Sequence, residues 1–157
     1  MQIGAHQLAN ALFAAPMAGV TDRPCRVLAR RYGAALAVSE MVSSRPELRA
    51  SRKSRLRLDH AGEPGPLSVQ IAGAEPAMMA EAARHNVERG AQIIDINMGW
   101  PAKKVCDRYA GPALLGDEAL VARILEAVVA ALGGPVALKV RTRADPARGS
   151  AVGVARV

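Results

Sequence analysis

Polar or unusual side chains recur in this sequence at the ends of short apolar runs. They are Pro16-Met17, Ser39-Glu40, Gln70, Asn97 and, after the last run, Lys139 and Arg141. Amide side chains both donate and accept hydrogen bonds, and Lys and Arg supply cations. In parallel α/β proteins the carboxyl ends of the strands meet at one edge, and barrel enzymes build their sites there. The pattern therefore predicts a site assembled from several strand ends.

One of these strand ends continues into a turn that holds the largest side chain. In "DINMGWPAKKV" (95–105) the turn reads Gly99-Trp100-Pro101. An indole N–H donates a hydrogen bond but has no proton to give at a useful pKa. Cys106 lies six positions further along and would have to move several ångströms to act as an acid there, when a misplacement of about 1 Å can cost 100-fold.

The cysteines offer no metal site. Cys25 and Cys106 lie 81 positions apart and form no CxxC pair, so neither a metal centre nor a disulfide framework is predicted. No apolar run approaches the roughly 20 residues that span a bilayer. The first residues lack the charged region of a signal peptide, so we expect a cytoplasmic protein without a membrane partner.

The apolar runs are expected to be buried strands. They cover residues 11–16, 35–40, 66–73, 92–97 and 135–140, each bounded by Gly, Pro or polar residues. Only 3% of residues are aromatic, so the core must be built from Ala, Val, Leu, Ile and Met.

Three helices are expected between these runs. The first has the stripe Cys25, Leu28, Ala29 and Tyr32, a cap at Thr21-Asp22 and a stop at Gly33. The second opens after Pro76, ends at Gly90 and carries the stripe Met79, Ala83 and Val87, with Met78 and Met79 as core filler. The third is capped by Asp117, stops at Gly133-Gly134 and carries the stripe Leu120, Ile124, Val128 and Leu132.

The alternation of strands and helices predicts an α/β fold with a parallel sheet covered by helices. Both a doubly wound sheet and a (β/α)8 TIM barrel fit the pattern. The polar strand ends favour the barrel, and no GxGxxG or GxxxxGK[ST] motif follows the first run. The sequence supplies about five of the eight strands of a barrel, so we expect its N-terminal part, an incomplete barrel with an open sheet edge.

The formal charge of +7 is concentrated in two clusters. Residues 45–60 and residues 139–157 each carry a net charge of +4. Basic clusters of this kind favour a polyanionic partner such as RNA or DNA. The alternative is a solvated arginine-rich loop together with a basic C-terminal segment.

Six segments together resemble a known enzyme family. They are "APMAGVTDRPCR" (15–26), "SEMVSS" (39–44), "VQIAG" (69–73), "DINMGWPAKKV" (95–105), "AGPALL" (110–115) and "LKVRT" (138–142). In this order they resemble the flavin-dependent tRNA-dihydrouridine synthases, and most of all the bacterial B-type subgroup. The resemblance implies that residues 1–157 are a partial TIM-barrel, FMN-binding catalytic domain, and that the family's C-terminal helical tRNA-binding domain is absent from this sequence.

The resemblance also implies an activity and roles for the strand-end residues. Members of the family reduce uridines in the tRNA D-loop to 5,6-dihydrouridine, with FMN as cofactor and NADPH as reductant. Pro16, Met17 and Ala18 would lie against the isoalloxazine ring, Gln70 would bind its pyrimidine edge, and Lys139 would place a cation near its N1–O2 region.

Two further residues would bind the substrate. Asn97 would present an amide to the uracil, and Arg141 would help to hold the nucleotide. Each of these roles has a structural alternative: Gln70 and Asn97 could be satisfied strand-end amides, and Lys139 could be an ion-pair partner at the barrel mouth.

The sequence departs from the family at the catalytic position. Trp100 stands where the family has the cysteine that donates a proton to the uracil, and loss of a general acid typically costs about 10²–10⁴-fold in rate. The bulk of Trp100 would also obstruct the uracil position. Three hypotheses about function are therefore open. The chain is an active enzyme, a catalytically impaired, decayed relative that at most binds flavin or RNA, or a basic RNA-binding module.

Overall fold

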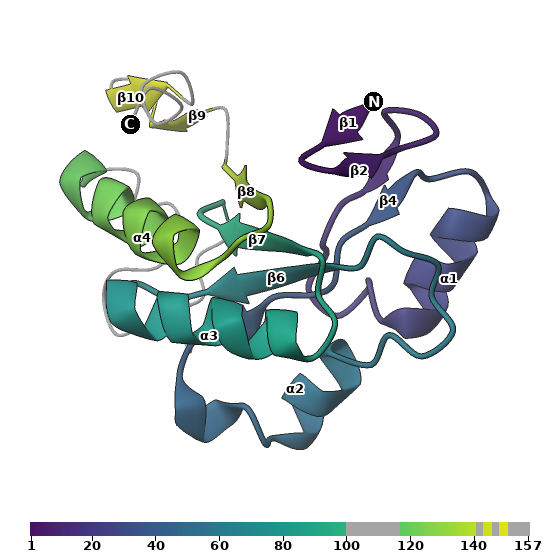
Figure 1. Cartoon of the computed structure of the whole chain (residues 1–157), viewed down its shortest axis with the longest axis horizontal. Helices are drawn as coiled ribbons and strands as arrows, with labels where there is room; N and C mark the ends of the chain where they lie inside the picture. The colour runs from purple at the N-terminus through teal and green to yellow at the C-terminus, as the bar shows by residue number, and fades with distance from the viewer. Residues whose placement is uncertain (100–116, 141–142, 146–147, 151–157) are drawn as a thin grey trace.

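The computed structural model describes residues 1–99 and 117–140, together with the backbone of residues 143–145 and 148–150. Strands and helices alternate along the chain, and the strands form a twisted sheet with helices packed against it (Figure 1).

All five predicted strands are present. They are β3 (Phe13–Ala14), β4 (Leu36–Ala37), β6 (Ser68–Ala72), β7 (Ile93–Asn97) and β8 (Val136–Lys139). β3 pairs with β4, and β6, β7 and β8 pair in that order, all in parallel. An isolated parallel bridge between Val38 and Ser68 links the two groups, and the short β5 (Val42–Ser43) pairs with the end of β6.

The order of the strands decides between the two folds that the sequence left open. A doubly wound sheet places its first strand inside the sheet and reverses direction there. Here the order β3-β4-β6-β7-β8 follows the chain without reversal, which is the arrangement of a (β/α)8 barrel. The prediction of a partial TIM barrel is confirmed, and the strands that the structure describes do not close into a complete one.

The connecting helices begin where the sequence predicts. α1 (Arg23–Arg31) is capped by Asp22, and α4 (Glu118–Ala131) by Asp117, each through its carboxylate. α3 (Pro76–Glu88) has Pro76 in its first turn, and its cap is Glu75. Gly33 and Gly90, just beyond α1 and α3, have positive φ angles of 99° and 101°, which favour glycine.

Several short elements were not predicted. β1 (Gln2–Ile3) and β2 (His6–Gln7) form an antiparallel hairpin, as do β9 (Arg143–Asp145) and β10 (Arg148–Ser150). The 3-10 helix η1 (Pro46–Leu48) and α2 (Arg52–Arg57) lie inside the basic segment 45–60.

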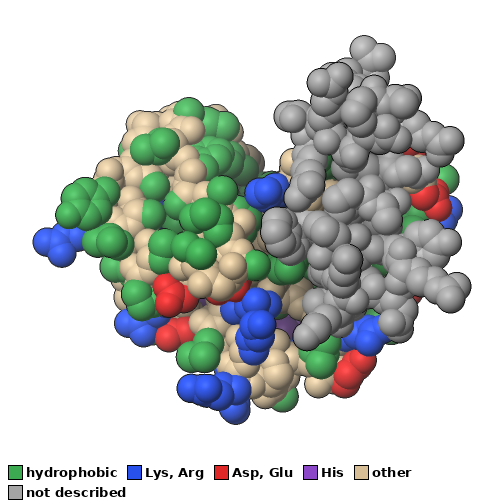
Figure 2. Space-filling model, turned by 180° about the vertical axis from the view of Figure 1, so that it is seen from behind, with side chains coloured by type: hydrophobic (Ala, Val, Ile, Leu, Met, Phe, Trp, Pro, Cys, Tyr) green, Lys and Arg blue, Asp and Glu red, His purple; other side chains and the backbone are tan. Residues whose placement is uncertain are grey.

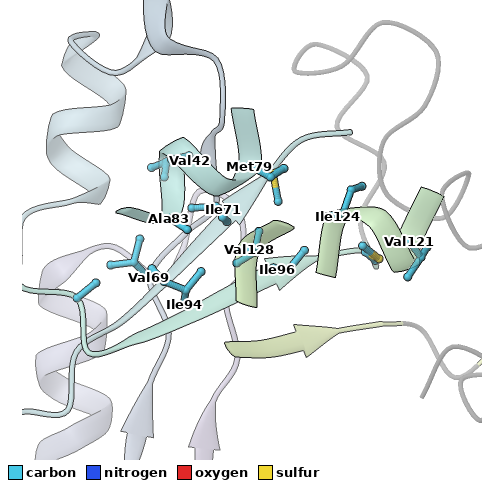
Figure 3. Close-up of a cluster of buried hydrophobic side chains, with 13 residues drawn as sticks. Val42, Val69, Ile71, Met79, Ala83, Ile94, Ile96, Val121, Ile124 and Val128 are labelled. Carbon is cyan, nitrogen blue, oxygen red and sulfur yellow. The ribbon is translucent and has the colours of Figure 1, made fainter. Parts of the chain in front are cut away.

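The main core lies between the sheet and helices α3 and α4 (Figure 3). Ile71, Ile94 and Ile96 project from the sheet onto Met79 of α3 and Ile124 of α4, and all five are fully buried or nearly so. A smaller cluster on the opposite face of the sheet consists of Leu8, Ala35, Leu36, Val38 and Ile93. This second cluster closes the amino-terminal end of the sheet below the polar strand ends.

The predicted core face of α1 is wrong. Leu28 is 53% exposed and Tyr32 is 81% exposed, whereas Arg26 is fully buried. Arg26 and Arg30, one helical turn apart, face the body of the protein because each donates to backbone carbonyls there, and Arg26 also pairs with Glu63. Viewed from behind, Figure 2 shows exposed hydrophobic side chains on the side of the molecule that carries α1.

The stripes of the other two helices are largely confirmed. Met79 and Ala83 of α3 are fully buried, and so are Ile124 and Val128 of α4. Val87 and Met78 are exceptions, at 41% and 40% exposure, so Met78 is not core filler.

Candidate functional site

A cavity of about 370 Å³ opens at the carboxyl ends of the parallel strands. Its lining comes from the loop after β3, from the segment before β5, and from the ends of β6, β7 and β8. The lining residues are Ala15, Pro16, Met17, Ala18, Met41, Gln70, Asn97, Gly99 and Lys139.

The strand-end residues singled out in the sequence are brought together here. Pro16, Met17 and Ala18 form one wall, and Gln70, Asn97 and Lys139 reach the cavity from three adjacent strands. Their binding roles remain predictions. Trp100, Cys106 and Arg141 lie outside the described residues.

Strand pairing explains why these side chains converge. Gln70 of β6 is in register with Asp95 of β7, and Asn97 of β7 is in register with Lys139 of β8. Side chains alternate between the two faces of a strand. Because Ile94 and Ile96 face the helices, Asp95 and Asn97 face the cavity side.

Asp95, which was not among the predicted site residues, lies at the base of this site. Its side chain is buried at 6% exposure, and its carboxylate Oδ2 accepts a hydrogen bond from Gln70 Nε2 at 2.5 Å. Burial raises the pKa of Asp95 to about 6, against the opposing effects of the Gln70 hydrogen bond and the Lys139 charge. The alternation of Asp95 with Asn97 on one strand was the signal that could have identified it.

The loop that forms the first wall is held by its own hydrogen bonds. The Met17 N–H donates to Thr21 Oγ1 at 2.8 Å, and the Thr21 hydroxyl donates back to the Met17 carbonyl at 3.1 Å. Thr21 is fully buried. The backbone of Met17 is therefore fixed, while its side chain is 47% exposed at the cavity.

A buried carboxylate joins this loop to the opposite wall. Glu40 Oε2 accepts from the Gly19 N–H at 2.7 Å and pairs with Arg57 at 3.0 Å. Arg57 also donates to the carbonyl of Met41 at 2.8 Å. Helix α2 thus ties together two segments that line the cavity.

Asn97 sits where the chain leaves β7. Its Oδ1 accepts from the Gly99 N–H at 3.0 Å, and its Nδ2 lies 2.9 Å from the Met41 sulfur. The amide therefore shapes the turn that precedes position 100.

The basic segment 45–60 is partly committed to ion pairs. Arg57 pairs with Glu40, and Arg49 with Glu81 at 2.8 Å. Arg52, Lys53 and Arg55 of α2 are exposed. The alternative of a solvated arginine-rich loop therefore holds for only part of this segment, which contains the helices η1 and α2, and binding of a polyanion stays a prediction.

The described part of the chain contains no group of three or more His, Cys, Asp or Glu side chains placed to hold a metal ion. None of its helices combines the length and the hydropathy that crossing a membrane requires.

Comparison with known proteins gives one consistent result. Residues 13–157 match the family model described as Dihydrouridine synthase. The chain is 63% identical to tRNA-dihydrouridine synthase B of Pseudomonas aeruginosa over 157 residues, which is 100% of this chain and 47% of that protein. It is 63% identical to the protein of the same name from Xanthomonas axonopodis pv. citri over 145 residues, 92% of this chain and 44% of that protein.

A third relative extends the same pattern. The chain is 59% identical to tRNA-dihydrouridine synthase B of Shewanella oneidensis over 157 residues, 100% of this chain and 49% of that protein. The chain thus spans about half the length of the curated relatives that it matches. With a family match over nearly all its residues, it belongs to the dihydrouridine synthase family.

Proposed function

We propose that this chain carries the flavin-binding half of a tRNA-dihydrouridine synthase, an oxidoreductase that reduces uridine in tRNA to 5,6-dihydrouridine. The observation that carries the proposal is the cavity at the strand ends, where Gln70, Asn97 and Lys139 meet the Pro16–Ala18 loop. The names of the relatives supply the substrate class, tRNA.

The chemistry of the cavity fits FMN. Met17, Met41 and Pro16 offer apolar surface for the flat face of an isoalloxazine ring, and Gln70 offers an amide for its polar edge. Lys139 would provide a cation for the negative charge that gathers on a reduced flavin. A volume of about 370 Å³ lies in the range of small-ligand pockets.

The protein's part in the reaction is to orient and to protonate. Bound FMN would supply the hydride for C6 of the uracil, with NADPH as its source of electrons. The uracil must leave its stack to reach the cavity, and Asn97, at the mouth beside Gly99, is placed to bind its edge. A proton must then reach C5 of the uracil from an acid on the protein.

Position 100 is where that acid is expected, and Trp100 cannot supply it. We therefore infer that this chain turns over about 10²–10⁴-fold more slowly than a counterpart with cysteine there. Because Trp100 cannot act as the acid, it also favours a second candidate function, the binding of flavin or RNA without turnover.

The test compares Trp100 with Trp100→Cys. Each variant is prepared in two forms: this chain alone, and this chain extended by the remaining residues of the Pseudomonas aeruginosa relative. Each protein is incubated with unmodified tRNA, FMN and NADPH, and the dihydrouridine formed is measured by mass spectrometry. We expect Trp100→Cys to raise the rate of the extended chain by at least about 100-fold. Cys106→Ser serves as the control and should change nothing. Equal rates with Trp100 and Cys at this position would overturn the role assigned to it.

A further inference from the structure

Asp95 is a buried carboxyl group that the core does not require. It lies on β7 between Ile94 and Ile96, which supply the apolar packing of that strand, and its own side chain is on the opposite face. Burying a carboxylate is unfavourable unless it is paired. The Asp95 carboxyl group is nevertheless buried below the cavity, where it accepts a hydrogen bond from Gln70 and lies near Lys139.

The hydrogen bond to Asp95 fixes the orientation of the Gln70 amide. An ionised carboxylate only accepts hydrogen bonds, so it must face the NH₂ group of Gln70 and not the carbonyl oxygen. Gln70 Oε1 accepts no hydrogen bond from the described residues, and Gln70 lines the cavity. The backbone N–H of Gln70 is itself held by Ser39 Oγ at 3.1 Å, so the residue is anchored at both ends.

We propose that Asp95 is a positioning residue, which holds the Gln70 amide so that its carbonyl oxygen is presented to the flavin as an acceptor. The matching donor is the N3–H of the isoalloxazine pyrimidine ring, the single N–H donor on that edge of the oxidised ring. The proposal rests on the proposed function, because it concerns how the same cavity recognises FMN. The new element is that flavin recognition depends on Asp95, a residue that lies below the cavity and does not line it.

A purely structural role for Asp95 makes different predictions. If Asp95 only filled space, Asn would replace it without consequence, since Asn has nearly the same shape. A positioning role requires an acceptor that cannot also donate. Asn can donate as well, so Asp95→Asn would let the Gln70 amide turn over and present NH₂ to the cavity.

The first measurement needs no flavin. In the ¹⁵N-labelled chain, the side-chain amide signals of Gln70, assigned by their loss in Gln70→Leu, are followed from pH 4.5 to 8. We expect them to titrate with a midpoint near pH 6 in the wild-type chain, from ionisation of Asp95. The titration should be absent in Asp95→Asn and unchanged in Glu126→Gln, which removes an exposed carboxylate from α4.

The second measurement is FMN affinity, followed by flavin fluorescence. Asp95→Asn should weaken binding about tenfold, and Glu126→Gln should leave it unchanged. FMN methylated at N3 should bind at least about tenfold more weakly than FMN to the wild-type chain, because a buried acceptor left unpaired is costly. This preference should largely disappear in Asp95→Asn.

The outcomes separate the two proposals. Gln70 amide signals that have the same chemical shifts and the same pH response in Asp95→Asn as in the wild-type chain overturn the positioning role. So does unchanged FMN affinity in Asp95→Asn. Failure of the wild-type chain to bind FMN contradicts the proposed function, and the amide titration then still decides whether Asp95 holds Gln70.

Discussion

At the residue scale, the site combines polar side chains that can bind a ligand with one buried carboxyl group whose ionised form destabilises the native state. Gln70, Asn97 and Lys139 reach the cavity, while Asp95 is buried below them with a pKa raised to about 6. A pKa difference of one unit corresponds to about 1.36 kcal/mol. The ionised form of Asp95 therefore costs the native state free energy at neutral pH.

This cost predicts a pH-dependent effect of Asp95→Asn. Because the native pKa lies above the ordinary value of 3.8, the native state binds the Asp95 proton more tightly than the unfolded state does. Its stabilising contribution is complete below about pH 4 and is lost as the pH rises to about 6. The stability of Asp95→Asn relative to wild type should therefore increase between pH 4 and 7.5, by up to about 3 kcal/mol.

Urea unfolding of both proteins at the two pH values measures this difference. The carboxylates with lowered pKa values, such as Glu63 and Glu81, are common to both proteins and cancel in the comparison. A stability difference that is the same at pH 4 and pH 7.5 would show that Asp95 titrates as an ordinary carboxyl group.

Trp100 is the other residue on which the proposed function depends. The inference of a missing acid rests on the family resemblance and on the chemistry of indole, and it stays a prediction. Asp95, in contrast, was identified only from the structure. An aspartate inside a run of isoleucines is easily read as an interruption of a buried strand.

At the element scale, α1 is held to the neighbouring loops by arginine side chains. The guanidinium of Arg26 is fully buried, contacts both carboxylate oxygens of Glu63 and donates to the carbonyls of Thr21 and Asp59. Thr21 in turn fixes Met17 at the cavity wall. The geometry of the Pro16–Ala18 loop therefore depends on Arg26, which is not part of the stripe predicted for this helix.

Removing Arg26 should be severely destabilising. Arg26→Met removes the guanidinium from the Glu63 carboxylate, itself 4% exposed, and leaves it beside His60 at 3.4 Å. Breaking a buried pair on one side costs about 3–5 kcal/mol. The neighbouring exposed Arg31→Ala should cost less than about 0.5 kcal/mol in the same urea titration.

The double variant Arg26→Met, Glu63→Gln should recover part of the loss, since no unpaired charge then remains buried. If Arg26→Met unfolds at the same urea concentration as the wild-type protein, the arginine does not anchor α1.

Strands and helix starts were predictable because their signals are local. Apolar runs bounded by Gly and Pro located β6, β7 and β8, and Asp22 and Asp117 located two helix starts. The inward face of α1 was not predictable, because it depends on carbonyls and carboxylates that lie far away in the sequence. The same holds for the pairs Arg57–Glu40 and Arg49–Glu81, which reduce the free charge of the basic segment.

At the scale of the whole molecule, the consecutive order of parallel strands explains why the site could be anticipated. Parallel strands in sequence order place all their carboxyl ends at one edge, so residues from positions 16 to 139 meet at one cavity. The exact partners within that cavity depend on strand register, which a run of apolar residues does not specify.

The charge of the whole chain fits a polyanionic substrate without identifying where it binds. The formal charge is +7, and exposed Arg52, Lys53 and Arg55 gather on α2. Under the proposed function, these charges would contribute sequence-independent attraction to tRNA, weakened by salt, and the cavity would recognise the uracil.

Flavin binding by the purified chain tests the central proposal most directly. The chain is mixed with FMN, passed through gel filtration and titrated by flavin fluorescence, alongside Gln70→Leu, Lys139→Met and the surface control Glu126→Gln. We expect one FMN per chain to be retained by the wild type and by Glu126→Gln, and binding at least about tenfold weaker in each of the two cavity variants. A colourless wild-type chain, or equal retention by all four proteins, would contradict a flavin site at these strand ends.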